Sequence, residues 1–116
     1  MPMYLLNERA TSEQVRAMME PFAKLRMIKI VVDIGRNILA GGGAMHFDCE
    51  QLLINNGSKQ VDLWGANWYP DEQTIEFESL INIRPRQNNR SIVLEDPVLQ
   101  RAVERVARQR LEGVFP

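Results

Sequence analysis

Residues 27–34 read MIKIVVDI, an almost continuous apolar run that is rich in β-branched residues. A strand with one exposed face would alternate between apolar and polar residues, whereas this run predicts a central strand buried on both faces. Asp33, near the end of the run, is an exception. The rest of the chain is therefore expected to supply the strands beside this one and the helices over it.

A first hairpin is predicted around residues 35–37, because the sequence Gly-Arg-Asn is typical of a tight turn. Residues 38–40 would then form the returning strand. The three glycines at 41–43 break this strand. They indicate a bulge or a close approach of the backbone to another group.

A second hairpin is predicted from two strands over 60–69 and 74–83, joined by a turn in which Pro70 suits the type I geometry. From Ile75 to Ile83, every second residue is apolar except Ser79. This alternation is the pattern of a strand with one covered face.

Three helices are predicted from their start signals. Thr11 and Gln14 form a capping-box pattern for the first helix, and Pro21 predicts its kink or early stop. Asp48 is expected to cap a short second helix. An Asp-Pro pair at 96–97 predicts the start of the last helix.

The resulting order, α-β-β-α-β-β-α, predicts an α+β fold with a four-stranded, mostly antiparallel sheet of two hairpins and helices packed on it. The 116 residues are expected to form a single domain, with 1–10 as a flexible arm or a short pairing segment. If helices covered only one face of the sheet, Trp64 or Trp68 would be exposed on the other. Such a face would favour a homodimer.

The formal net charge of −1 gives no support for general nucleic-acid binding. The chain has one cysteine, which cannot form an intrachain disulfide, so nothing in the sequence points to secretion. No segment approaches the roughly 18 apolar residues that a membrane helix needs. We therefore expect a cytoplasmic protein with no membrane partner.

His46, Asp48 and Glu50 alternate along the chain and would point the same way if this segment were extended. Together with Asp62 they would suit a divalent metal such as Mg²⁺, Mn²⁺ or Zn²⁺, with His46, Asp48 and Asp62 as ligands and Glu50 as the catalytic base. In the alternative interpretation, Asp48 is a helix cap, Glu50 is a first-turn acid and His46 is a hydrogen-bonded structural residue. Whether residues 46–50 are extended or helical decides between the two.

A second candidate site lies in the arginine-rich loop after the last predicted strand. Arg84 and Arg90 could hold a small anionic ligand, because guanidinium groups bind carboxylates and phosphates bidentately, and Trp64 could stack on its ring. The alternative is a solvated loop whose arginines pair with nearby carboxylates. Cys49 is flanked by acids, which favours a buried structural thiol over a nucleophile.

Three segments, GGGAMHFDCE, GSKQVDLWGANWYP and INIRPRQNNRSIVLEDP, together resemble a family of small prokaryotic proteins of unknown function. The resemblance covers about residues 27–111, a family-like core. It implies a grouping, without an activity, substrate or cofactor. The positions that carry the resemblance are His46, Asp48, Glu50, Ser58, Gln60, Asp62, Trp64, Asn67, Arg84, Asn89, Arg90, Glu95 and Asp96.

Two functions remain in view. The first is a small homo-oligomeric binding or accessory protein with a polar site near the glycine-rich segment. The alternative is a metal-dependent hydrolase or nuclease that uses His46, Asp48, Glu50 and Asp62.

Overall fold

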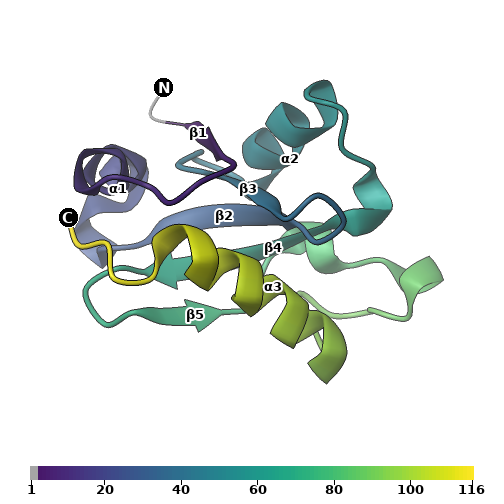
Figure 1. Ribbon diagram of the computed structural model, residues 1–116. Helices are drawn as coiled ribbons and strands as arrows, with labels where there is room; N and C mark the ends of the chain where they lie inside the picture. The colour runs from purple at the N-terminus through teal and green to yellow at the C-terminus, as the bar shows by residue number, and fades with distance from the viewer. Residues whose placement is uncertain (1–2) are drawn as a thin grey trace.

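The computed structural model describes residues 3–116, which form an α+β fold around one antiparallel sheet. The strands lie in the order β1-β3-β2-β4-β5 (Figure 1). Their bounds are Tyr4–Leu6 for β1, Ile28–Asp33 for β2, Ile38–Gly41 for β3, Leu63–Tyr69 for β4 and Thr74–Glu76 for β5. The helices are α1 (Ser12–Met18), α2 (His46–Asn55) and α3 (Pro97–Leu111). Four short 3₁₀ helices join them, η1 (Glu20–Leu25), η2 (Gln60–Asp62), η3 (Leu80–Asn82) and η4 (Pro85–Gln87).

The sheet has five strands among these residues, so the prediction of four is wrong. The additional strand is β1, which pairs antiparallel with β3 at the edge of the sheet. Its three residues are too few to show a strand periodicity, and burial of Leu6 in the core holds it in place. The segment before the first helix is thus a pairing segment in its described part.

The predicted central strand is confirmed as β2, which pairs with β3 on one side and β4 on the other. Both of its faces are covered. Ile28, Ile30 and Val32 pack into the core beneath α1 and α3, whereas Val31 packs on the opposite face against α2. In Figure 1, α3 crosses one face of the sheet and α2 lies on the other.

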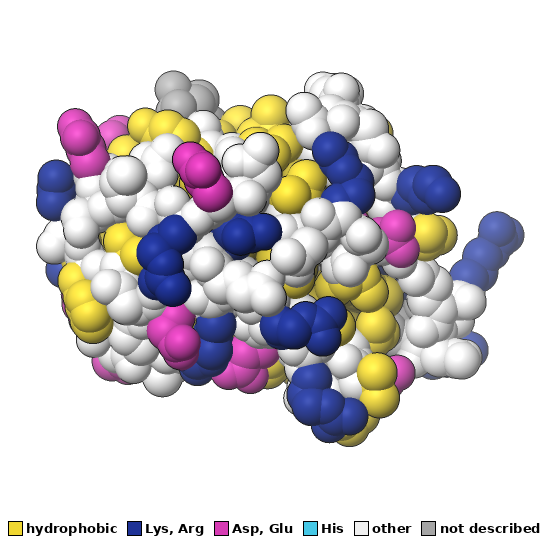
Figure 2. Space-filling model, in the orientation of Figure 1, with side chains coloured by type: hydrophobic (Ala, Val, Ile, Leu, Met, Phe, Trp, Pro, Cys, Tyr) yellow, Lys and Arg dark blue, Asp and Glu magenta, His cyan; other side chains and the backbone are white. Residues whose placement is uncertain are grey.

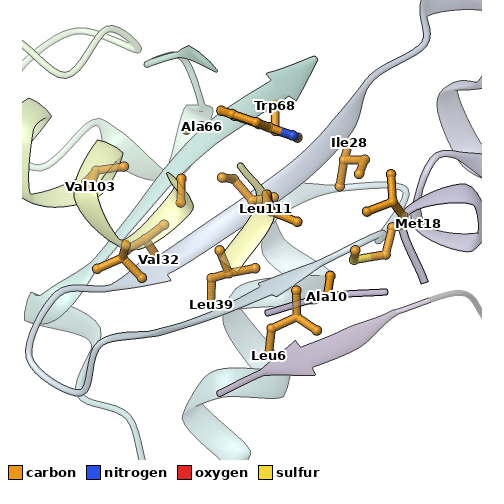
Figure 3. Packing of buried hydrophobic residues seen from close by; sticks show 14 of the residues in the cluster. Leu6, Ala10, Met18, Ile28, Val32, Leu39, Ala66, Trp68, Val103 and Leu111 are labelled. Atoms are coloured by element: carbon orange, nitrogen blue, oxygen red, sulfur yellow. The ribbon is translucent and has the colours of Figure 1, made fainter. Parts of the chain in front are cut away.

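The main core gathers side chains from four strands and two helices into one layer (Figure 3). Trp64 and Trp68 belong to this layer, with exposed fractions of 1% and 0%. Helices cover both faces of the sheet, so no tryptophan face is open for association. The homodimer stays a prediction, without this argument for it.

Two of the three helix starts agree with the sequence. Thr11 caps α1 in a capping box, and Asp96 caps α3 through the backbone N–H of Val98. Helix α1 ends at Met18, and Pro21 lies in the first turn of the 3₁₀ helix that begins at Glu20, where its missing N–H is tolerated. The expected cap at Asp48 is wrong, because α2 already begins at His46.

The last predicted strand, 74–83, forms a ladder with β4 only at residues 74–76. Beyond it the chain changes partner: the carbonyl of Phe77 accepts from Leu94 N–H, and Ser79 N–H donates to the carbonyl of Ile92. The alternation in the sequence is therefore real, but its pairing partner is the segment 92–94. The other predicted strand, 60–69, begins with η2 and becomes β4 at Leu63.

Buried asparagines hold this segment against the sheet. Asn82 Oδ1 accepts from Gly65 N–H at 2.8 Å, and its Nδ2 donates to the Gly65 carbonyl at 3.0 Å. Asn89 donates to the carbonyls of Asn82, Ser91 and Val93. Side-chain amides thus replace part of the backbone ladder between β4 and the loop.

Gly65 permits a close approach of this segment to β4. A Cβ atom at this position would lie 2.5 Å from the Cβ of Ser79, a distance that real Cβ contacts do not show. The glycine in the DLWGAN sequence is therefore required by packing. The helices in the described part of the chain are too short or too polar to cross a membrane.

Candidate functional site

The arginine-rich loop of residues 84–95, called the arginine loop below, is anchored to the start of β4 by Arg84. Its guanidinium carbon lies 3.9 Å from the ring centroid of buried Trp64. Four of the five guanidinium N–H groups have acceptors. These acceptors are the carbonyls of Gln60, Leu63 and Ile81 and the Oε1 of Gln87. Burial lowers the pKa of Arg84, and the charge of Glu50 opposes that shift.

Arg90 lies elsewhere in this loop, exposed to solvent. Figure 2 shows the face that carries α3, where basic and acidic side chains are mixed and basic side chains project at the end of the loop after β5. The three residues predicted to bind an anion therefore differ in character: Trp64 is buried, Arg84 is largely engaged in hydrogen bonds and Arg90 is free in solvent.

Residues 46–50 are helical, so their side chains do not point the same way. His46 and Glu50, one helical turn apart, are buried. Asp48 instead accepts from the backbone N–H of Met45, at 3.1 Å, in the first turn of α2. Asp62 lies beside the β2–β3 turn, where its carboxylate would be 2.8 Å from a Cβ on Gly35.

Across residues 3–116, no three His, Cys, Asp or Glu side chains lie close enough together to hold a metal ion. The predicted metal ligands His46 and Asp62 lie at different positions along β4. His46 contacts Ala66 in the middle of that strand, whereas Asp62 precedes its first residue. Glu50 is 4% exposed, and its Oε2 has no hydrogen-bond partner among the described residues.

His46 is buried beneath the start of α2, with Nε2 2.9 Å from the carbonyl of Ala66. A carbonyl can only accept, so Nε2 carries the proton and Nδ1 is an acceptor. Burial lowers the pKa of His46 to about 4, assisted by the charge of Lys29 and opposed by the hydrogen bond to Ala66. The imidazole is thus neutral at physiological pH.

The same face of the sheet carries a pocket of about 300 Å³ between the start of α2, the middle of the sheet and the segment 78–81. It lies directly after the glycine-rich segment in sequence, since residues 44–47 form one wall. The polar residues in its lining are Lys29, His46, Asn67, Glu78 and Ser79. The exposed apolar residues around it are Met45, Phe47, Leu80 and Ile92.

Asn67 contributes a buried acceptor to this pocket. Its Nδ2 donates to Glu76 Oε1 at 2.8 Å, which fixes the orientation of the amide because a carboxylate only accepts. Oδ1 is buried and has no hydrogen-bond partner within residues 3–116 while His46 is neutral; a hydrogen bond between the Asn67 side chain and the protonated His46 ring raises the pKa of His46. The wall of the pocket therefore holds an acceptor that lacks a donor.

Lys29 lies beside Asn67 in the register of β2 and β4. Its ammonium is 4.9 Å from the ring centroid of Phe22, and no salt bridge between described residues involves Lys29 or Glu78. The pocket thus contains one cation and one carboxylate without partners of opposite charge.

Sequence reasoning overlooked Lys29, Asn67 and Glu78 as site residues. A signal for Lys29 was present, because it is a charged residue inside the otherwise apolar run 27–32. Asn67 belongs to the segments that carry the family resemblance. Glu78 gave no separate signal, since it fits the polar positions of an ordinary alternating strand.

Acidification tests the environment of His46, the only histidine of the chain. Because its pKa is lowered on folding, the unfolded chain binds a proton that the folded protein rejects, so stability falls as pH drops from about 6.5 toward 4. We expect a loss of about 2 kcal/mol between pH 7.5 and pH 5, measured by urea unfolding. The variant His46→Gln keeps a donor for Ala66 and should lack this loss. Equal pH dependence in both proteins would contradict the assignment.

Comparison with curated proteins and with solved structures gives no significant match. One family profile matches residues 4–110, nearly the whole chain, and reaches further toward the N-terminus than the core placed at 27–111. The match spans the sheet from β1 onward and the pocket described above. The chain therefore belongs to the family described as protein of unknown function (DUF5674).

Proposed function

We propose that this protein is a small binding or accessory protein that holds a small molecule in the pocket beside the glycine-rich segment. The observation that carries the proposal is Asn67 Oδ1, a buried acceptor without a donor in the pocket wall. Leaving such an atom unsatisfied costs about 1–3 kcal/mol. Because Oδ1 is buried, a ligand can donate to it only after a small shift of the Asn67 side chain, and that contact would remove this cost.

Three further features support the proposal. Lys29 and Glu78 are charged groups that line the pocket without salt-bridge partners in the described structure. The volume of about 300 Å³ is at the lower end of the range for ligand sites. Phe47 and Leu80 expose 52% and 75% of their surface at the rim, where a ligand would cover them.

The alternative, a metal-dependent hydrolase or nuclease, is not favoured by this geometry, because His46, Asp48 and Asp62 serve separate parts of the fold. The anion site at Arg84, Arg90 and Trp64 stays a prediction. So do the homodimer, which light scattering measures, and the cytoplasmic location.

A fragment screen monitored by amide NMR shifts tests the proposal. Ligands are expected to shift the resonances of residues 44–47, 67 and 78–81, and the variant Asn67→Ala should weaken their binding about tenfold. Asn7→Ala, at an exposed position outside the pocket, is the matched control. The same titration with phosphate, Mg²⁺, Mn²⁺ and Zn²⁺ covers the predicted anion and metal sites. Shifts confined to the arginine loop, or no shifts with any compound, would overturn the pocket proposal.

A further inference from the structure

We infer that the ligand of this pocket is a small zwitterion with an apolar side chain, of the chemical class of the apolar α-amino acids. The inference rests on the proposed function and adds the chemistry of the ligand. It follows from the order in which charged, polar and apolar groups are arranged around the pocket.

The two unpaired charges lie on opposite sides of Asn67. Lys29 on β2 is the register partner of Asn67 on β4, which in turn is the partner of Glu76 on β5. Glu78 follows two residues later. Since neighbouring strands are about 4.8 Å apart, the cationic and acidic sides are separated by about two strand spacings at the backbone. Long side chains from both sides can therefore reach one compact ligand between them.

The free carboxylate on the acidic side is that of Glu78. Glu76 already accepts hydrogen bonds at Oε1 from Asn67 Nδ2, at 2.8 Å, and from the hydroxyl of Tyr69, at 3.2 Å. Glu78 lines the pocket and has no salt bridge among the described residues. An ammonium group of a ligand would be the natural counter-charge for Glu78.

The orientation of Asn67 adds a requirement for a donor. Because Nδ2 is held by Glu76, the amide presents Oδ1 away from that contact, as an acceptor. A purely anionic ligand could pair with Lys29 but would leave this acceptor unsatisfied. Once the buried Asn67 side chain shifts toward the pocket, an ammonium group satisfies Asn67 and Glu78 together, and a carboxylate on the same ligand pairs with Lys29.

The apolar residues in the pocket lining indicate the third group of the ligand, which is its side chain. Phe47, Leu80 and Ile92 are apolar and expose 52%, 75% and 40% of their surface. A short apolar side chain would be covered by these residues. The volume of about 300 Å³ leaves room for a small molecule.

Calorimetry with L-leucine and two truncated analogues tests each charged contact. Isoamylamine lacks the carboxylate, and 4-methylpentanoate lacks the ammonium group. We expect leucine to bind about ten to one hundred times more tightly than either analogue, since each charged hydrogen bond contributes on that scale. Lys29→Met should reduce the advantage of leucine over isoamylamine, and Glu78→Gln should reduce its advantage over 4-methylpentanoate. L-valine, L-methionine and L-phenylalanine complete the panel.

Lys24→Met and Glu13→Gln remove the same charges at exposed positions outside the pocket and serve as controls. The zwitterion would be overturned if 4-methylpentanoate bound as tightly as leucine, or if the variants at Lys29 and Glu78 behaved like the controls. If none of the amino acids binds while fragments still shift the pocket resonances, the zwitterion is wrong and the proposed function stands. If neither amino acids nor fragments reach the pocket, the proposed function itself fails.

Discussion

Replacing Asn82 with aspartate is expected to lower the free energy of unfolding by about 4 kcal/mol at pH 7. The side chain is fully buried, and its Nδ2 donates to the carbonyls of Gly65, at 3.0 Å, and Ile92, at 3.3 Å. A carboxylate of the same shape would place a buried negative charge against two carbonyl oxygens. Urea unfolding monitored by tryptophan fluorescence measures the loss.

The pH dependence separates this cause from a general loss of packing. The introduced carboxyl can donate to Gly65 only when protonated, so its pKa should rise on folding. A group with a raised folded pKa contributes stability at low pH and loses it as pH rises. The variant should therefore regain stability relative to wild type between pH 7 and pH 4. Asn82→Ala should show a loss without this pH dependence, and Asn7→Asp, at an exposed site, almost no loss. A constant difference across this pH range would contradict the proposed role of Nδ2.

Gly65→Ala is the second change with a large expected effect, about 3 kcal/mol of destabilisation. The new Cβ would lie 2.5 Å from the Cβ and 2.6 Å from the Oγ of Ser79. Neither partner can easily retreat. Ser79 N–H is bonded to the Ile92 carbonyl, and the Gly65 backbone is bonded to Asn82.

A double-mutant cycle tests the contact directly. Ser79→Gly removes the opposing Cβ, and should cost about 1 kcal/mol by itself because it frees the backbone. Added to Gly65→Ala, it should restore about 2 kcal/mol. Gly57→Ala is the comparison, because Gly57 has a φ of +104° and a Cβ added there would have no atom within 4 Å. Ser79→Gly should not rescue that variant; additive losses for residues 65 and 79 would show that they do not collide.

The elements that local chemistry specifies were predictable from the sequence. The continuous apolar run indicated the central strand β2, Thr11 and Asp96 indicated the starts of α1 and α3, and Pro21 indicated the end of α1. Each of these signals acts within a few residues of its effect. The predicted start of α2 was too late, because Asp48 is the third residue of the helix and not its capping residue. A carboxylate at this third position also forms a hydrogen bond at the helix start, here by accepting from the backbone N–H of the capping residue Met45.

The pocket was not predictable for a different reason. Its polar groups come from β2, the start of α2, β4 and the segment after β5, and only the pairing of the strands brings Lys29 and Asn67 together. A polar site beside the glycine-rich segment was expected from the sequence only in general terms. The sequence could not show that the segment 77–79 leaves β4 to pair with residues 92–94, because the alternation within 74–83 does not depend on which segment it pairs with.

Both edge strands of the sheet, Tyr4–Leu6 and Thr74–Glu76, are only three residues long. Unpaired strand edges are templates for further strands, and short edges limit how many hydrogen bonds an incoming chain can form. The two edges of this sheet therefore present few backbone groups to which a further strand could bind, so they do not favour fibre-like growth or strand exchange. Contacts between strand edges would therefore contribute little to the predicted homodimer, which would have to use side-chain surfaces instead.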